Sequence, residues 1–229
     1  MDVTTALQSR VSTRCFRPDP VPDALIYDIL DVARWAPSGG NLQPWQVIVV
    51  AGEARDQVVR LAQETFGAGD TGGDEYPIYP APLHEPYRTR RFVSGEQLYD
   101  LLGIPRADKE GRLLQLARNL EFFGAPAAVF FIVDRRMGHG QWAHLGMFMQ
   151  SVALVAQERG VSSCFQEFWG LVRAPLADHF GLDEHHTVYC ALALGYADES
   201  APENALRTER ADVAEIATFL TGHDGTVNT

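Results

Sequence analysis

Apolar residues follow one another in short runs at several points of this chain. Gln46–Ala51 is a continuous apolar run of strand length, which predicts a buried strand. Ala127–Asp134 is rich in valine, isoleucine and phenylalanine and also predicts a strand, as does Thr187–Tyr196. Ser162–Trp169 is mixed in character and is predicted to be extended.

Between these runs, apolar residues recur at helical spacing. Pro22–Trp35 places its leucines and isoleucines on one face and predicts an amphipathic helix. Gln141–Arg159 is apolar on all sides, so it is predicted to be buried in a core or between subunits, and we favour a subunit interface. Further helices are predicted at Asp2–Ser9, Glu53–Phe66, Gln97–Gly103, Asp108–Phe123, Pro175–Phe180 and Asp212–Leu220.

The segment from about 67 to 107 interrupts this pattern. Gly67–Gly73 is rich in glycine and aspartate, and Tyr76–Pro86 contains four prolines, so both predict loops. Its aromatic and basic residues either close over a ligand or form a solvated excursion: Tyr76, Tyr79, Tyr87, Arg88, Arg90 and Arg91. No βαβ unit carries a GxGxxG fingerprint, which argues against a Rossmann domain.

The composition of the chain excludes several classes of protein. The chain has 229 residues, a net charge of −11 and a pI near 5.0, which argues against a general nucleic-acid or anionic-membrane surface. No apolar run approaches the roughly 20 residues of a membrane span. Three distant cysteines and a polar start without a signal peptide predict free thiols and a cytoplasmic location: Cys15, Cys164 and Cys190.

In so acidic a chain, a site for an anion has to be local, and Ser9–Phe16 offers one. If this stretch is extended, Arg10, Ser12 and Arg14 project to the same side. Two guanidiniums with a hydroxyl between them match a phosphate group. The alternative is a solvated polar edge.

A second stretch, Ala36–Trp45, joins a predicted helix to a predicted strand. Two prolines and two glycines restrict its shape. Between them lie three neutral side chains suited to the polar edge of a flat heterocycle, Ser38, Asn41 and Gln43. The alternative is an ordinary helix-to-strand turn.

Together these stretches resemble the nitroreductase family of flavin mononucleotide (FMN) enzymes, which carry an Arg-x-Ser-x-Arg/Lys motif and a Pro-Ser-x-x-Asn-x-Gln-Pro-Trp loop. Gly160–Glu167 and Asn204-x-x-Arg207-x-x-Arg210 are similar to two further family motifs, and the resemblance extends from Ala6 to Leu220. It implies an FMN site formed by Arg10, Val11, Ser12, Arg14, Pro37, Ser38, Gly39, Asn41, Gln43, Cys164, Phe165, Gln166 and Glu167, with Arg207, or else Arg210, closing the phosphate site.

The resemblance also implies a fold and an activity. The fold is α+β, with a mixed central β-sheet flanked by helices, in a single domain 1–229 with an insertion at about 67–107. Two chains form an intertwined homodimer, and Ser38, Asn41 and Gln43 then come from the partner subunit. The implied enzyme takes a hydride from NADPH or NADH onto flavin N5 and reduces nitroaromatic, quinone or similar flat acceptors by a ping-pong mechanism.

In this family the cofactor carries out the chemistry, so no catalytic side chain is predicted. A backbone N–H near Glu167 is implied to meet N5, and solvent can supply the product's proton. The subgroup resembled is that of nitrobenzoate-type reductases. The sequence leaves two alternatives: a relative with another reaction, such as flavin fragmentation, dehalogenation or dehydrogenation, or a flavin-binding protein without turnover.

Other chemistries have weaker support. Glu184-His185-His186 is the densest group of metal-ligand residue types, but neither zinc nor facial-triad spacing is present, so no metal site is predicted. His139 and His144 are expected to cap a helix or lie in an interface, with His144 facing the flavin pocket as the alternative. No Gly-x-Ser-x-Gly nucleophile motif occurs.

Overall fold

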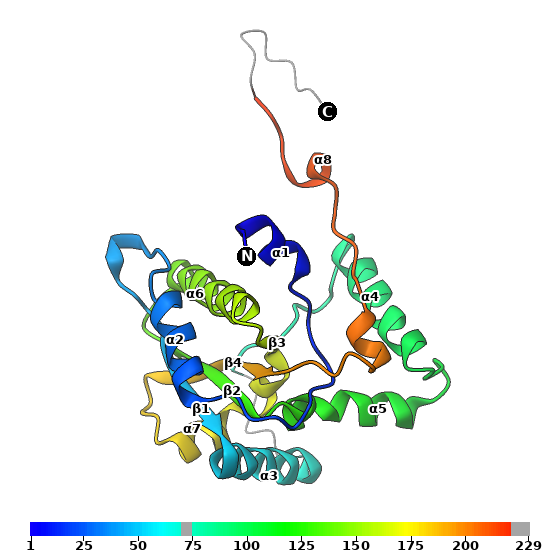
Figure 1. Cartoon of the computed structure of the whole chain (residues 1–229), viewed down its shortest axis with the longest axis horizontal. Helices are drawn as coiled ribbons and strands as arrows, with labels where there is room; N and C mark the ends of the chain where they lie inside the picture. The colour runs from blue at the N-terminus through cyan, green and yellow to red at the C-terminus, as the bar shows by residue number, and fades with distance from the viewer. Residues whose placement is uncertain (70–74, 221–229) are drawn as a thin grey trace.

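The computed structural model describes residues 1–69 and 75–220, and the tail of the predicted loop Gly67–Gly73 falls outside them. At its centre is a four-stranded sheet with the order β1-β2-β4-β3 (Figure 1). The strands are β1 Gln46–Ala51, β2 Ala127–Asp134, β3 Ser162–Gln166 and β4 His186–Gly195. The sequence therefore predicted all four strands, three of them within one residue at each end.

The direction of pairing differs from the prediction. We expected a mixed sheet, but all three pairs of neighbouring strands are antiparallel. Within the described ranges, the parallel pairing is an isolated bridge between Ser12 and Ser163, outside the named strands. Apolar runs in the sequence reveal where the strands are. The direction of each strand depends on the end of the sheet to which its connection returns, and an apolar run does not indicate that end.

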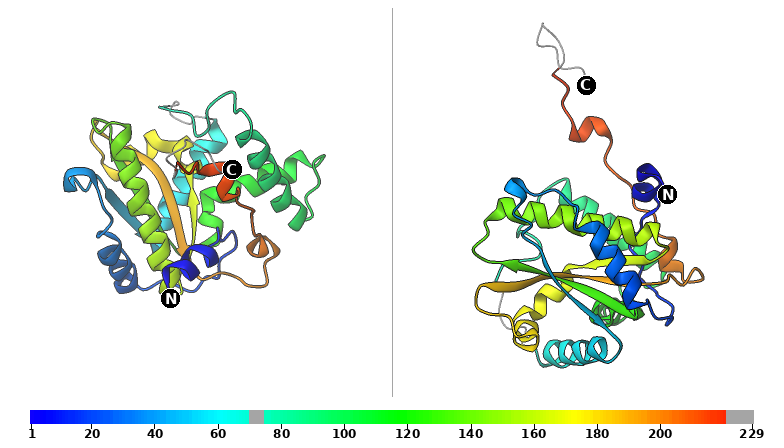
Figure 2. Two further views of the ribbon diagram at one scale, coloured as in Figure 1. Left: turned by 90° about the horizontal axis from the view of Figure 1, so that it is seen from above. Right: turned by 60° about the vertical axis from the view of Figure 1, so that its left-hand side comes forward.

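Helices cover both faces of the sheet (Figure 2). Side chains of β2 alternate between two cores: Phe131 packs with α2 (Asp23–Ala33) and α6 (His139–Glu158), whereas Phe130 packs against α3 (Gly52–Ala68) and α7 (Arg173–Phe180). Both faces of β2 are thus buried, which explains its unbroken apolar run. The remaining helices and 3-10 turns are α1 Val3–Ser9, η1 Gly39–Asn41, α4 Tyr87–Leu101, α5 Lys109–Ala117, η2 Arg118–Gly124, η3 Glu167–Val172, η4 Pro202–Ala205 and α8 Val213–Ile216.

No helix in the described ranges is long and apolar enough to cross a membrane. The strand β1 is less buried than predicted: it pairs with β2 alone in the sheet, and Val49 is 40% exposed. β1 is thus an edge strand whose outer side is open in one chain.

Helix α4 was predicted incompletely. We expected a helix from Gln97, but it begins at Tyr87 and includes the arginines predicted to lie in the loop region. The helix contains no buried residue, so its sequence lacks the apolar stripe that reveals the other helices.

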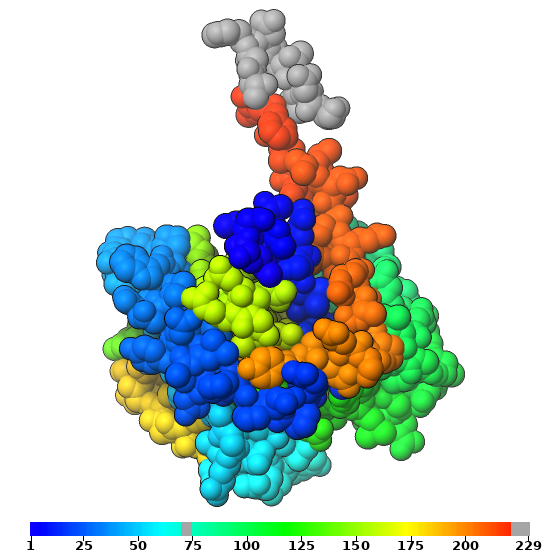
Figure 3. Space-filling view, in the orientation of Figure 1, coloured from blue at the N-terminus to red at the C-terminus, as the bar shows by residue number. Residues whose placement is uncertain are grey.

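The C-terminal segment leaves the body of the molecule after η4. Figures 1 and 3 show it projecting beyond α1 as an arm, which we define as residues 206–220. The predicted helix Asp212–Leu220 is shorter in the structure, where α8 has four residues. Four large apolar side chains of the arm are exposed, namely Val213, Ile216, Phe219 and Leu220. A single chain therefore leaves the arm without an apolar partner.

Candidate functional site

The Arg10–Arg14 segment runs beside strand β3. Helix α1 ends as the N–H of Arg10 donates to the carbonyl of Ala6 at 3.1 Å. The segment then forms the parallel bridge between Ser12 and Ser163, and the N–H of Thr13 donates to the Ser163 carbonyl at 3.0 Å. The segment is thus extended, as predicted, and its residues lie next to Cys164.

Asn204 fastens the C-terminal motif to this segment. Its Oδ1 accepts from the N–H of Arg14 at 2.7 Å and from that of Cys15 at 3.3 Å. Its Nδ2 donates to the carbonyls of Cys15 at 2.7 Å and Asp198 at 2.9 Å. One side chain therefore joins two motifs 190 residues apart in the sequence.

Arg10 lies within electrostatic reach of two other arginines, Arg14 and Arg210, and of Cys164. Burial lowers the pKa of the Arg10 guanidinium, and the positive charges of Arg210 and Arg14 lower it further. Burial raises the pKa of the Cys164 thiol, against the opposing effects of Arg14, a hydrogen bond from Ser12 and Arg10. Among the described residues, none of these three arginines forms an ion pair with a carboxylate. This is a concentration of uncompensated positive charge, suited to an anion.

The two arginines of the C-terminal motif lie differently. The guanidinium of Arg207 donates to the carbonyls of Asn204 at 2.9 Å and Leu206 at 3.0 Å. Arg210 donates to Thr208 and Glu209, and its charge reaches Arg10. Both arginines thus donate to main-chain carbonyls, and of the two it is Arg210 whose positive charge lowers the pKa of Arg10.

A cavity of about 1230 Å³ opens beside this group. One wall consists of Cys164–Glu167 together with Arg14, and another is helix α4. Figures 1 and 2 show α4 and α5 on the β3 side of the sheet, away from β1. Ligand pockets commonly measure about 300–1,000 Å³, so this cavity has room for a large cofactor and a second flat molecule.

One polar group in the cavity wall has no hydrogen-bond partner among the described residues. Gln115 on α5 is only 8% exposed, and its Nε2 forms no hydrogen bond among the described residues. Its Oε1 accepts from Arg118 at 3.4 Å. A buried amide without a partner is costly, so this N–H₂ group fits a ligand with hydrogen-bond acceptors, as FMN has. Sequence analysis missed Gln115, because on its helix Leu113, Leu114 and Leu116 are exposed and the polar Gln115 is the buried residue.

At the end of β3, side chains fix the path of the chain along the cavity. Gln166 donates through Nε2 to the carbonyl of Asn119 at 2.9 Å. Glu167 begins η3, and Tyr189 donates to its Oε1 at 3.5 Å. Burial raises the pKa of the Glu167 carboxyl. Phe165 packs near Phe131, with ring centroids 6.3 Å apart. The predicted third motif therefore lines the cavity.

The Pro37–Trp45 loop is held by its own hydrogen bonds. Ser38 Oγ accepts from the N–H of Gln43 at 2.9 Å, and Gln43 Nε2 donates to the carbonyl of Asn41 at 3.2 Å. Both Asn41 and Gln43 have positive φ angles, 54° and 49°, a conformation that asparagine tolerates better than most residues. Their side chains face solvent. A Cβ atom on Gly39 would lie 3.0 Å from His144 Cε1, so the loop packs closely on the start of α6.

The loop and the arginine group lie at opposite ends of α6. The loop contacts His144, whereas Gln157 donates to Ser9 Oγ, just before Arg10, at 3.3 Å. Thirteen residues of helix separate these contacts, which corresponds to about 20 Å. Within one chain, the predicted site residues of the loop do not line the cavity, namely Pro37, Ser38, Gly39, Asn41 and Gln43. Arg10, Val11, Ser12, Arg207 and Arg210 are not among its lining residues either, so Arg14 is the one residue of the two arginine motifs that lines it.

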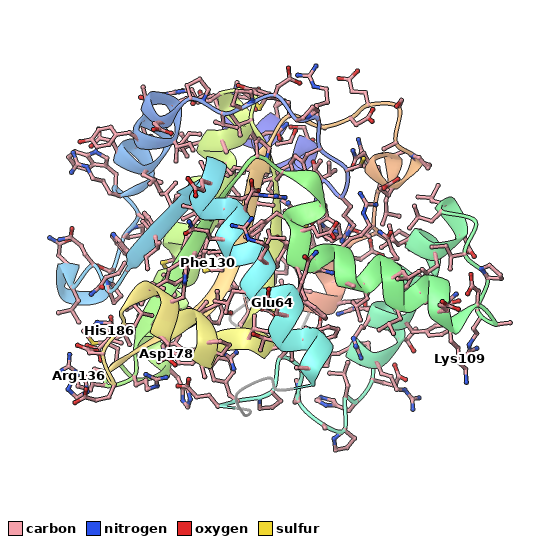
Figure 4. The ribbon with its side chains drawn as sticks, turned by 90° about the horizontal axis from the view of Figure 1, so that it is seen from below. Glu64, Lys109, Phe130, Arg136, Asp178 and His186 are labelled. Atoms are coloured by element: carbon pink, nitrogen blue, oxygen red, sulfur yellow. The ribbon has the colours of Figure 1, made fainter. Side chains whose placement is uncertain are left out.

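The histidines take part in local contacts. His186 pairs through Nδ1 with Asp183 at 2.6 Å, and Figure 4 shows it near Arg136, across the molecule from Lys109. Between residues 1 and 69 and between 75 and 220, no three metal-ligating side chains form a group. His144 Nδ1 lies 3.0 Å from Gln141 Oε1 on its own helix.

Comparison with known proteins identifies the class. Residues 7–196 match the family model described as the nitroreductase family. The chain is 38% identical to the nitrobenzene nitroreductase of Ectopseudomonas oleovorans, over 93% of this chain and 95% of the relative. It is 34% identical to the 4-nitrobenzoate reductase of Pseudomonas putida, over 97% of each.

A solved structure agrees with these matches. The FMN and NADPH-dependent nitroreductase NfnB from Sphigopyxis sp. strain HMH superposes with a TM-score of 0.94 at 41% identity, covering 97% of this chain and 100% of that chain. The chain belongs to the nitroreductase family. The resemblance inferred from four short motifs is thereby confirmed.

Proposed function

We propose that the protein is an FMN-dependent oxidoreductase that uses NADPH or NADH to reduce nitroaromatic compounds, quinones or similar flat acceptors. The observation that carries this proposal is the group of Arg10, Arg14 and Arg210, which form no ion pair with a carboxylate of the described residues, next to a large cavity whose wall includes Arg14 and Cys164. Relatives named as nitroreductases match nearly the whole chain, which supports the same activity here.

Different residues of the chain bind different parts of FMN. Arg10, Ser12 and Arg14 bind the phosphate by charge-assisted hydrogen bonds, and Val11 contributes backbone between them. Arg210 closes this site, because its positive charge acts on the Arg10 guanidinium, and its contacts with main-chain carbonyls resemble those of Arg207. Gln115 offers its unpartnered N–H₂ group to an acceptor on the cofactor.

The segment Cys164–Glu167, which lines the cavity, would hold the flavin ring, and the N–H near Glu167 would tune it. Bound there, FMN supplies the transfer of a hydride from NAD(P)H and of two electrons to the acceptor. The aromatic side chains of the cavity exclude water from the ring and stack against flat substrates in turn. Solvent at the cavity mouth supplies the proton of the product, so no side chain acts as a dedicated acid.

The working enzyme is an intertwined homodimer, and one domain, 1–229 with an insertion at about 67–107, is its unit. The separation of about 20 Å between the two motifs along α6 supports this. If α6 packs antiparallel against its partner copy, the partner's Ser38, Asn41 and Gln43 approach the cavity of the first chain. The exposed apolar side chains of the arm fit the same assembly, since they need a covering surface.

An absorbance spectrum of the purified protein tests the function. We expect flavin bands, and steady NADPH or NADH oxidation when nitrobenzene is added. A spectrum without flavin, combined with no gain of flavin on incubation with FMN, would contradict the proposal. Bound flavin without any turnover would instead favour a flavin-binding protein, and turnover of flavin itself would favour a fragmenting relative.

A further inference from the structure

Helix α4 presents one face to the cavity, opposite the segment Cys164–Glu167. Eight residues of the helix line the cavity, namely Arg88, Arg91, Phe92, Ser94, Gly95, Glu96, Leu98 and Tyr99. Whatever stacks on the proposed flavin ring therefore lies within reach of α4.

Three arginines stand close together at the start of this helix, but two of them are neutralised. Arg88 pairs with Glu85 at 2.7 Å, and Arg90 pairs with Glu215 of the arm at 2.9 Å. Arg91 forms no ion pair and no hydrogen bond with any residue of the described ranges. Its charge is therefore uncompensated at the cavity mouth.

The acidic residues of the cavity do not offset this charge. Glu96 is held by Arg112 through two bonds, of 2.5 and 3.0 Å. Glu167 lies on the opposite wall, where burial raises the pKa of its carboxyl. Of the other two arginines in the wall, Arg88 is paired with Glu85, and Arg14 belongs to the group proposed to bind phosphate.

Stacking holds the Arg91 guanidinium in a defined orientation. It lies 4.3 Å from the centroid of the Tyr79 ring, within the range of a cation–π contact. The Arg91 side chain donates no hydrogen bond to a residue of the described ranges, so its N–H groups are free to bind a carboxylate with two parallel hydrogen bonds. Tyr79 also lines the cavity, so the pair forms part of its wall.

We propose that Arg91, stacked on Tyr79, selects flat aromatic acceptors that carry a carboxylate group. This inference rests on the proposed function, since it concerns the acceptor of the same cavity. The enzyme should therefore prefer aromatic acids to neutral aromatic compounds of the same shape. Because Arg91 lies at the exposed mouth, added salt should weaken the preference.

Paired substrates test the proposal in the holoenzyme. 4-Nitrobenzoate and 4-nitrobenzamide have nearly the same shape and differ in charge. Arg91→Met should lower kcat/KM for the acid by about 5- to 10-fold, less than a buried charged hydrogen bond would give, and leave the amide unchanged. Arg91→Lys should restore part of the loss. Non-reducible benzoate, titrated against the flavin absorbance, should show the same fold-change in Kd.

Two matched variants serve as controls. Arg88→Met removes a cavity arginine that Glu85 already neutralises, and Arg106→Met removes an arginine that stacks on Phe92 at 5.4 Å but does not line the cavity. Both should keep the acid-to-amide ratio. An equal fall for acid and amide in Arg91→Met would overturn the proposal.

A change confined to KM for NADPH relative to NADH would also overturn it, and would assign Arg91 to the 2′-phosphate of the donor. The failure of the proposed function is distinguishable. In that case neither nitro compound is reduced by the wild-type protein, whereas benzoate binding, followed by calorimetry, still reports on Arg91.

Discussion

Arg10 and Arg14 contribute two of the three uncompensated charges near Cys164. Replacing either by alanine removes charge-assisted hydrogen bonds to the FMN phosphate, which contribute on the order of 1.5–3 kcal/mol. We expect the affinity for FMN to fall by about 10- to 100-fold, measured by fluorescence titration of the apoprotein. Arg17→Ala is the control, because Arg17 pairs with Asp19 at 3.3 Å outside the arginine group. Unchanged affinity in both variants would contradict the assignment.

Asn204 carries no charge, but its replacement should affect FMN binding as the replacement of Arg10 or Arg14 does. Asn204→Ala leaves the N–H of Arg14 and the carbonyl of Cys15 without their 2.7 Å partners. We expect the free energy of unfolding to fall by about 1–3 kcal/mol, measured by urea denaturation of the apoprotein. FMN affinity should fall as well, since the arginine segment loses its support. A loss of stability with full FMN affinity would show that the segment holds its shape without Asn204.

At the residue scale, the sequence predicted what depends on local spacing. The alternation of Arg10, Ser12 and Arg14 was visible because an extended segment repeats every two residues. The partnerless amide of Gln115 was not visible, since a helical pattern shows that a polar residue is present but not which cavity it lines. The contact between Asn204 and Arg14 spans 190 residues, and nothing in either segment alone encodes it.

At the scale of elements, strands were easier to predict than helices at the surface. Strand β2 is buried on both faces, so its sequence is apolar without interruption, and the ends of the apolar run coincide with the ends of the strand. Helix α4 has no buried residue, and its start at Tyr87 was missed for that reason. The antiparallel direction of the sheet depends on the path of long connections, which composition does not specify. The residues that line the cavity from α4 therefore required the structure.

Helix α6 was predicted to be apolar all round, and its outer face offers a test of the dimer. Met147 is 46% exposed, whereas Val152 is fully buried in the core of one chain. Met147→Asp should therefore weaken dimerisation without unfolding the protomer, because a buried charge at an interface is costly. Light scattering should report the 25.3 kDa chain mass for the variant and twice that mass for the wild type.

Leu114→Asp is the matched control for this variant. Leu114 is a 64% exposed apolar residue on α5, away from α6, so its replacement should leave the dimer intact. FMN should be lost from Met147→Asp if the partner's loop completes the site. A wild-type protein that is monomeric and retains its flavin would contradict the dimer.

At the scale of the whole molecule, the predicted site does not lie in one place. The first, third and C-terminal motifs contact one another, but only Arg14 and Cys164–Glu167 of them line the cavity, while the loop Pro37–Trp45 remains at the far end of α6. A sequence motif does not indicate whether its residues complete the site of their own subunit or the site of the partner subunit. The family could therefore be predicted from the residues, but the arrangement of the complete site depends on the assembly.

The proposed function has a consequence for the order of the reaction. If FMN binds in the large cavity, nicotinamide and acceptor would use the same space beside the flavin. The two substrates therefore exclude each other, and initial rates with NADPH varied against nitrobenzene should give parallel double-reciprocal lines. High nitrobenzene should inhibit competitively against NADPH, because it occupies the oxidised enzyme as well. Lines that intersect to the left of the axis would require both molecules to be bound at once, which this single shared space does not allow.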